Sequence, residues 1–193
     1  MAKPSNRAKI LTEGLRVVHE RGFGGASVRD IVQAAGVPQG SFTNHFVSKE
    51  AFGLEIINLH FDSARDLIQR TLRNDALAPL QRMRAYIDAS TSYLNQTEMR
   101  NGCLFGNFSA EASDHSELIR LRLVEIFAEV QQAIAYCLRS AVAAGELRPD
   151  FDCDEIAGFM VISLQGAILL SKVQRGPAPV ERFKHVLFSI LLT

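Results

Sequence analysis

Apolar residues recur every three or four positions along most of the chain, the spacing that places them on one face of an α-helix. The first such segment covers residues 6–21, and Gly22 follows it as a stop signal. No strand-like alternation of useful length interrupts the pattern. The spacing therefore predicts an all-α protein of about nine helices.

Two short helices are expected next, because both have clear boundary signals. Ser27 with Asp30 three residues later is a capping-box pattern that begins the first of them. Gly36 ends it, since glycine tolerates the positive φ common at helix ends, and Pro38 suits the first turn of the next helix. Two helices joined by such a tight turn are typical of a helix-turn-helix.

The rest of the chain is predicted to form longer helices separated by polar or glycine-containing breaks. Ser48 is expected to cap a helix that runs to about Asn74. The others are expected at about 79–97, 104–112, 115–144, 153–174 and 178–191. We divide the chain into an N-terminal helix-turn-helix domain, residues 1–50, and a second helical domain, residues 51–193.

Charge is distributed unevenly between these two segments. The whole chain of 193 residues is neutral, with 21 Lys or Arg and 21 Asp or Glu. Residues 1–50 hold seven of the basic residues and four of the acidic ones, so the first segment is mildly basic and the remainder mildly acidic. A basic N-terminal segment followed by an acidic remainder is compatible with a polyanionic partner for the N-terminal segment.

Three further observations concern location and cofactors. No apolar run reaches bilayer-spanning length, and the polar N-terminus lacks a signal-peptide core, so a membrane is not an expected partner. The cysteines, Cys103, Cys137 and Cys153, are odd in number and widely spaced, which makes a disulfide scaffold unexpected. We expect a cytoplasmic protein with no cofactor.

The stretch RGFGGASVRDIVQAAGVPQGSFTNHFVSKEAF, residues 21–52, resembles the N-terminal domain of TetR-family transcriptional repressors. The resemblance is close over the first fifty or so residues and looser over the remaining helices. It implies double-stranded operator DNA as the partner. The family usually carries an aromatic residue, commonly Tyr, where this chain has Thr43, and another aromatic residue or His at Asn44, so a Tyr contact to phosphate is missing here.

The third helix is expected to enter the major groove, where small polar groups can reach base edges. Candidate readers are Gln39, Gly40, Ser41, Thr43 and Asn44. Candidates for backbone contacts or for shaping the turn are Ser27, Arg29, Pro38, His45 and Lys49. Phe42 and Phe46 are four apart and should pack inward. For any one polar residue the alternative is a solvated surface; the spacing of the whole motif favours DNA binding.

One helix-turn-helix makes few contacts, and a two-fold dimer that reads a palindromic operator doubles them. Helices 153–174 and 178–191 carry wide apolar stripes, which by resemblance form a four-helix interface between subunits. We assign to the first stripe Ile156, Phe159, Met160, Ser163, Ala167 and Leu170, with Gly158 and Gly166 allowing close approach. The alternative is that both helices serve only the intramolecular core.

The middle helices would then enclose a pocket for a small-molecule effector, with Tyr93, Phe108, Glu111 and Phe127 as possible lining residues. The alternative for the aromatic residues is ordinary core packing. Nearby acidic and histidine side chains also suggest a metal site, namely Glu111, Asp114, His115 and Glu117. A helix cap at Ser113 or Asp114 explains that cluster better, and no metal is expected.

Cys103 sits in a Gly-Cys-Leu sequence before a predicted helix. This segment, and the later segment around Lys172, resemble a TetR subgroup that contains the N-ethylmaleimide-reductase repressor and acrylate-responsive repressors. The resemblance implies an electrophile or redox sensor in which Cys103 reacts and Lys172 is its partner. A helix N-terminus and a nearby ammonium would both favour the thiolate. The alternative is a cysteine packed in the core.

Other function classes have less support. The chain contains no Gly-x-Ser-x-Gly, phosphate loop, His-Glu-x-x-His or Cys-x-x-Cys motif, so we do not expect an enzyme. An architectural DNA-binding protein without an effector, and a repressor with a purely non-covalent ligand, remain alternatives. The architectural protein differs in predicting no ligand-dependent release from DNA.

Overall fold

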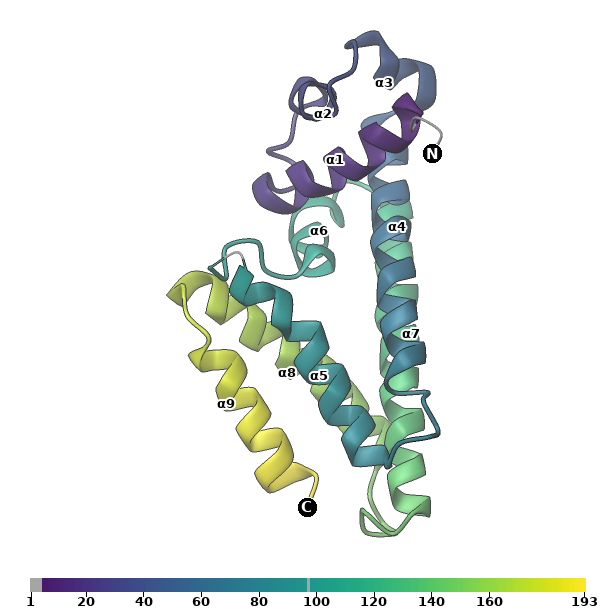
Figure 1. The fold of residues 1–193 in the computed structure, drawn as a ribbon, viewed down its shortest axis with the longest axis vertical. Coiled ribbons are helices and arrows are strands. Elements are labelled where there is room, and N and C mark those ends of the chain that lie inside the picture. The colour runs from purple at the N-terminus through teal and green to yellow at the C-terminus, as the bar shows by residue number, and fades with distance from the viewer. Residues whose placement is uncertain (1–4, 97) are drawn as a thin grey trace. The chain divides into compact units, whose positions relative to one another are not determined.

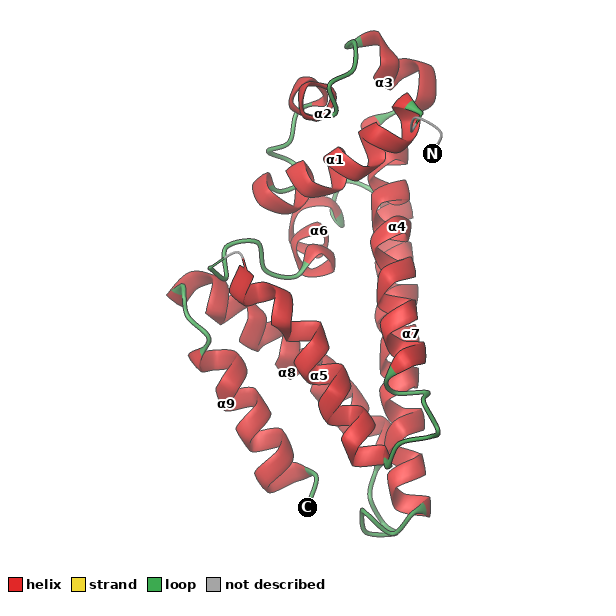
Figure 2. Ribbon diagram, in the orientation of Figure 1, coloured by secondary structure: helices red, strands yellow, loops and turns green. Residues whose placement is uncertain are grey.

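The computed structural model describes residues 5–96 and 98–193, and within them the chain forms nine α-helices, a closing π-helical turn and no strand (Figures 1 and 2). The helices are α1 (Asn6–Arg21), α2 (Val28–Ala34), α3 (Gly40–His45), α4 (Lys49–Arg70), α5 (Pro79–Gln96), α6 (Leu104–Ala112), α7 (Glu117–Ala143), α8 (Cys153–Gln174) and α9 (Ala178–Val186), followed by the turn Leu187–Leu191. The all-α fold predicted from the spacing of apolar residues is confirmed.

Helix boundaries differ from the sequence prediction at three places. Helix α4 ends at Arg70, before the expected Asn74. Helix α7 begins at Glu117 because Ser116, and not Ser113 or Asp114, accepts the capping hydrogen bond, from the amide of Ile119 at 3.1 Å. The predicted last helix divides into α9 and the π-helical turn.

The chain packs into two compact units that do not follow a single cut in the sequence. Unit 1 comprises the residues up to Asp62 together with Leu104–Val124, and unit 2 comprises Ser63–Cys103 together with Glu125–Thr193. Unit 1 therefore contains α1 to α3, the first part of α4, α6 and the beginning of α7. The division at residue 50 remains a prediction about function, whereas packing groups α6 with the helix-turn-helix.

The core of unit 1 holds the helix-turn-helix in place through aromatic rings. Phe42 and Phe46 of the α3 segment are each 3% exposed, which confirms that they point inward. Their ring centroids lie 5.2 and 5.1 Å from that of Phe52 on α4, distances typical of favourable aromatic pairs. Ile10 of α1 and Ile31 of α2 are fully buried in the same unit. Helix α3 is thus fixed to its unit by one face.

The core of unit 2 is built mainly from apolar side chains of α5, α7 and α8, together with Leu72 just after α4. Its fully buried members include Leu72, Met83, Ile87, Leu138 and Ala157. Cys137 and Cys153 belong to this core. The thiol of Cys137 donates to the carbonyl oxygen of Pro79 at 3.2 Å, and burial raises the pKa of this thiol to about 11. Both observations fit a structural cysteine.

Helix α8 is apolar on more than the face that it buries. Its length and composition alone would allow it to cross a bilayer, which corrects the prediction that no apolar run is long enough; a core helix of a soluble protein passes the same test. Residues such as Met160, Leu164 and Ile168 recur at helical spacing on the buried face. Phe159 and Ile162 lie on the exposed surface. The second apolar surface requires its own explanation.

Candidate nucleic-acid interface and effector region

Helix α2 and the turn after it have the geometry that their sequence predicts. The capping box is present: the amide of Asp30 donates to Ser27 Oγ at 3.1 Å, and the amide of Ser27 donates to Asp30 Oδ2 at 3.0 Å. Hydrogen bonding by Ser27 and, more weakly, the charge of Arg21 lower the pKa of Asp30. Gly36 ends the helix with φ +61°, where a β-carbon is unfavourable.

Helix α3 and the two residues before it carry most of the exposed candidates for DNA contact. Of the predicted DNA-contacting residues, Pro38, Gln39, Gly40, Thr43, Asn44 and His45 are all exposed. Ser41 differs, because it is 8% exposed and lies on the packed side of the helix with Phe42. A β-carbon on Gly40 would meet nothing within 4 Å, so this glycine is not required by internal packing. It leaves room for a partner to approach the backbone.

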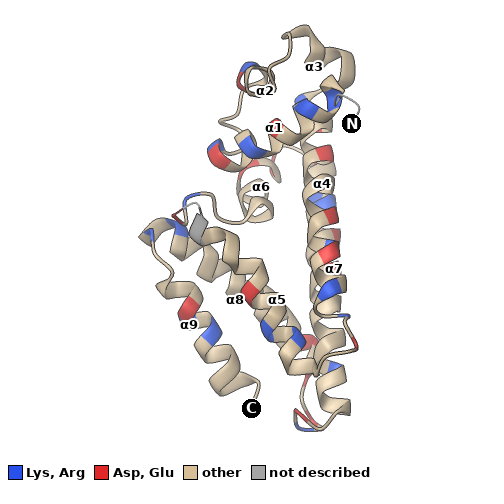
Figure 3. Cartoon of the chain, viewed as in Figure 1, with Lys and Arg blue, Asp and Glu red and all other residues tan. Residues whose placement is uncertain are grey.

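Three residues predicted to contact phosphate differ in the hydrogen bonds that they already make within the protein. Arg29 is exposed on α2, and Figure 3 shows basic positions on both α1 and α2. Ser27 hydrogen-bonds Asp30 through both its amide and its hydroxyl, so a phosphate at Ser27 would compete with that carboxylate. Lys49 Nζ donates to the carbonyl oxygen of Phe23 at 2.6 Å and lies 4.8 Å from the centre of the Phe23 ring. Its ammonium is therefore directed toward the protein.

Cys103 and Tyr93 belong to the same part of unit 2. Cys103 is half-buried immediately before α6 and packs against the unit 2 core. The hydroxyl of Tyr93 donates to the carbonyl oxygen of Gly102 at 3.2 Å. Burial, and secondarily the charge of a Cys103 thiolate, raise the pKa of Tyr86 to about 12 and also raise that of Tyr93. Lys172 is half-buried on α8 in unit 2, and its pairing with Cys103 stays a prediction.

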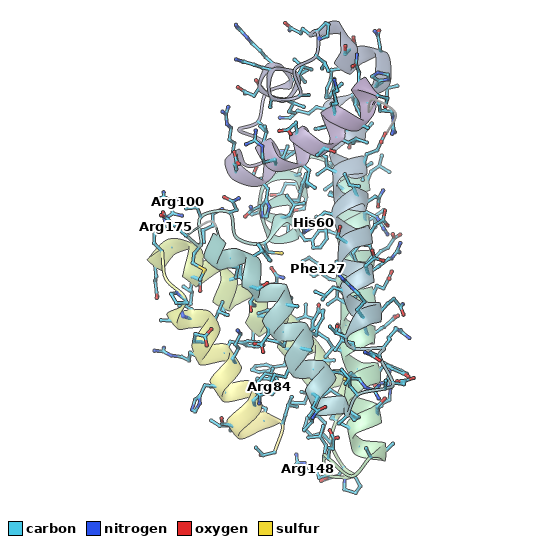
Figure 4. The ribbon with its side chains drawn as sticks, in the orientation of Figure 1. His60, Arg84, Arg100, Phe127, Arg148 and Arg175 are labelled. Atoms are coloured by element: carbon cyan, nitrogen blue, oxygen red, sulfur yellow. The ribbon has the colours of Figure 1, made fainter. Side chains whose placement is uncertain are left out.

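The other predicted pocket residues are divided between the units. Phe127, labelled in Figure 4, is half-buried on α7 in unit 2. Phe108 is in unit 1, where its ring centroid lies 4.9 Å from that of Phe23. Glu111, also in unit 1, is exposed and accepts a hydrogen bond from the amide of Gly24 at 2.8 Å. Phe108 and Glu111 thus contact the turn between α1 and α2.

The predicted acidic and histidine cluster does not gather around a common centre. Across residues 5–96 and 98–193, no group of three or more His, Cys, Asp or Glu side chains is arranged to hold a metal ion. Glu111 binds the Gly24 amide, and Glu117 forms a two-point pair with Arg120 on the same helix.

A groove of about 420 Å³ lies between α8 and α9 within unit 2. It is lined mainly by apolar residues, including Phe159, Ser163, Leu170, Phe183, Val186 and Leu191. The stripe predicted for α8 is only partly right, because Met160 and Ala167 are buried within the unit while Phe159 and Leu170 are about half exposed. The exposed set therefore lies on the two helices that the sequence assigns to dimerisation.

Sequence reasoning missed His60 on α4, labelled in Figure 4. Its ring centroid lies 5.0 Å from that of Phe105 and 6.1 Å from that of His19, both within unit 1. Burial, with a smaller effect of His19, lowers the pKa of His60 from its ordinary 6.5 to about 4. Its spacing of four from the buried Ile56 was the available signal that it faces inward.

Two family models match the chain. The model for bacterial regulatory proteins of the tetR family covers residues 10–56, and the model for the tetracyclin repressor-like C-terminal domain covers residues 79–187. The first match contains the helix-turn-helix, and the second contains most of the remaining helices.

Known relatives cover most of the chain. The HTH-type transcriptional repressor DhaR of Mycobacterium sp. (strain GP1) is 38% identical over 192 residues, 100% of this chain and 95% of that protein. The transcriptional regulator AcuR of Cereibacter sphaeroides is 32% identical over 90% of this chain and 80% of that protein. The crystal structure of reduced E. coli NemR superposes with a TM-score of 0.87 at 26% identity, covering 96% of each chain.

Proposed function

We propose that this chain, which belongs to the TetR family of bacterial regulatory proteins, acts in the cytoplasm as a dimeric repressor that a small molecule or electrophile releases from its operator. Members of this family are DNA-binding transcriptional regulators. The observation that carries the proposal is the exposed polar surface of α3, held on an aromatic core by Phe42 and Phe46. A rigid support with a polar reading face is what major-groove recognition requires.

We assign the base contacts to Gln39, Thr43 and Asn44, which are exposed on or beside α3. Amide and hydroxyl groups can donate to and accept from base edges, and Gly40 lets the backbone approach the groove. The Thr43 hydroxyl donates to the Gly40 carbonyl at 3.1 Å, which leaves its oxygen available as an acceptor. Arg29 is the proposed phosphate contact with the fewest competing interactions.

Dimerisation is proposed through α8 and α9. The groove between these helices and the exposed apolar residues of α8, such as Ile162 and Leu169, offer the kind of surface that a second copy would cover. A dimer would present two copies of α3 to a palindromic operator and so double the contacts made by one.

For the effector we propose covalent capture at Cys103, with Lys172 as its partner. Cys103 is half-buried, whereas Cys137 and Cys153 are buried and burial raises the pKa of both thiols. Addition of the Cys103 thiolate to an unsaturated carbonyl compound forms one S–C bond at the β-carbon. The C=C π pair moves to an enolate, which then takes a proton from water at the α-carbon, so no oxidant is needed.

The test is release from DNA by N-ethylmaleimide. We expect wild-type protein to lose operator binding in step with one adduct per chain, and Cys103→Ser to keep its binding. Cys153→Ser serves as the matched control, because it removes a thiol that we place in the core. Equal release of wild type and Cys103→Ser would overturn the assignment of the covalent mechanism to Cys103. A protein that no effector releases would instead be an architectural DNA-binding protein.

A further inference from the structure

The turn between α1 and α2 is tightly constrained within unit 1. Gly22 adopts φ +80°, a region that residues with a β-carbon avoid. A β-carbon at Gly22 would also lie 2.5 Å from the Glu111 Oε1 atom, and one at Gly25 would lie 2.5 Å from the Arg21 carbonyl oxygen. Gly22 is therefore explained by backbone conformation and by the close approach of the Glu111 carboxylate, and Gly25 by the close approach of a carbonyl oxygen.

A single peptide group in this turn is held from both sides by charged side chains. The Phe23 carbonyl and the Gly24 amide belong to the same peptide unit. Lys49 Nζ, at the start of α4, donates to that carbonyl at 2.6 Å, and Glu111, on α6, accepts from that amide at 2.8 Å. Hydrogen bonds to charged groups are stronger than those between neutral groups. The ammonium and the carboxylate also attract one another across the peptide.

Apolar contacts support the same arrangement. The Phe23 ring packs against Phe108 of α6 with centroids 4.9 Å apart. On the α4 side, a β-carbon on Gly53 would lie 2.8 Å from the Phe23 ring, so α4 approaches this ring as closely as a glycine permits. The Ser116 hydroxyl, in the segment that follows α6, donates to the carboxylate of Glu50, the residue after Lys49. Residues far apart in sequence thus converge on the Phe23–Gly24 peptide.

We infer that Lys49 and Glu111 are positioning residues for DNA binding: by holding the Phe23–Gly24 peptide, they couple α6 to the orientation of the α2–α3 reading surface. The peptide lies three residues before Ser27, which caps α2, and α6 begins directly after Cys103. The inference rests on the proposed function, in which α3 reads DNA. It assigns Lys49 a role different from a phosphate contact, because its ammonium already binds the Phe23 carbonyl.

The sign of a charge change distinguishes this role from simple electrostatics. Replacing Glu111 by Ala removes a negative charge from the DNA-binding unit, so electrostatic attraction to DNA alone predicts equal or tighter binding. Loss of the positioning contact predicts weaker binding. Asp114→Ala is the matched control, since Asp114 is an exposed acid just after α6. Glu111→Gln keeps an oxygen that can accept from the Gly24 amide and tests whether the acceptor is what matters.

The experiment uses the full-length protein and a DNA duplex that wild type selects from a random library, with affinity measured at several salt concentrations. We expect Glu111→Ala to weaken binding about tenfold, the scale of one charge-assisted hydrogen bond. Glu111→Gln should stay within about threefold of wild type on the same scale, and Asp114→Ala should bind no more weakly than wild type. Lys49→Met should also bind about tenfold more weakly, with an unchanged salt slope.

The double variant Lys49→Met with Glu111→Ala should be little worse than either single variant, because both act on one peptide. Hydrogen exchange at the Gly24 amide should be faster in Glu111→Ala, and melting curves identify any variant that has lost its fold. Tighter or unchanged binding by Glu111→Ala, or a salt slope that falls by about one in Lys49→Met, would overturn the inference. Failure of wild type to select any duplex would instead contradict the proposed DNA-reading role itself.

Discussion

Helices α3 and α8 each have residues that remain exposed after their unit has folded, but the two exposed surfaces have opposite chemistry. Exposed positions on α3 and the turn before it are small and polar, such as Gln39, Thr43 and Asn44. Those on α8 are large and apolar, with Ile162 at 73% and Leu169 at 61% exposure. A polar face suits a hydrated, charged partner, whereas an apolar face is stabilised by burial against another protein surface. The two surfaces therefore suit two different kinds of partner.

The largest expected effect comes from placing a charge in the apolar surface of α8. Leu169→Glu should dissociate the dimer, because burying an unpaired carboxylate is costly, and operator affinity should fall by about 100-fold or more as two-site contacts are lost. Sedimentation and DNA titration measure the two changes. Leu118→Glu is the matched control, since Leu118 on α7 is 59% exposed but lies outside α8. Comparable dissociation by both variants would break the distinction between these surfaces.

A change of pH should affect the stability of unit 1, which carries α3, without altering the residues on the α3 surface. The folded state depresses the pKa of His60 from 6.5 to about 4, so the unfolded chain binds more protons between these values. Stability should therefore be highest above pH 6.5 and should fall by up to about 3 kcal/mol as the pH drops toward 4. Chemical denaturation at several pH values measures this loss. His60→Gln should flatten the curve in that window; an identical slope would contradict the assignment to His60.

Substitutions on α3 should change which DNA sequence is preferred. Gln39→Ala or Thr43→Ala should cost about 1–3 kcal/mol for the preferred base pair and less for its replacements, because a base-specific contact is lost. Competition between operator variants measures that difference. Ser41→Ala is the control within the same helix, as Ser41 is buried and should alter stability more than preference. Uniform weakening across all sequences by Gln39→Ala and Thr43→Ala would argue against α3 as the reader.

The smallest expected effect concerns the backbone of the DNA. Arg29→Ala should weaken binding to all sequences about equally and lower the salt slope by about one, since one phosphate contact is lost. Measuring affinity against salt concentration for two unrelated duplexes checks both points. A sequence-dependent loss would move Arg29 from backbone contact to base reading and would sharpen the boundary of the polar surface.

The parts of the fold that the sequence predicted depend on short-range signals. Ser27 with Asp30, the glycine after α2, and two phenylalanines four apart each report on neighbours within one helical turn, and the structure has all three as expected. Capping of α7 was mispredicted because several residues before it could cap. Ser116 is the capping residue, and its hydroxyl also contacts Glu50, 66 residues away.

The candidate site was likewise predictable only where short-range sequence signals determine it. The surface of α3 follows from the local motif, apart from Ser41, whose inward direction depends on packing. Glu111 was expected in a pocket, but it binds the amide of Gly24, 87 residues earlier in the chain. This pairing cannot be detected from hydrophobic periodicity, because one partner is a glycine in a turn and the other is a single exposed acidic residue. Long-range contacts of this kind require the folded chain.

Hydroxyl-radical footprinting on a selected operator tests most directly that a dimer reads DNA through two copies of α3. We expect two protected segments related by two-fold symmetry, with centres about 34–36 Å apart or a multiple of that spacing. Protection of the deoxyribose sugars within each segment should weaken in Gln39→Ala, and Leu169→Glu should lose both segments at the concentration that saturates wild type. A single protected segment without symmetry, unaffected by Gln39→Ala, would contradict this arrangement.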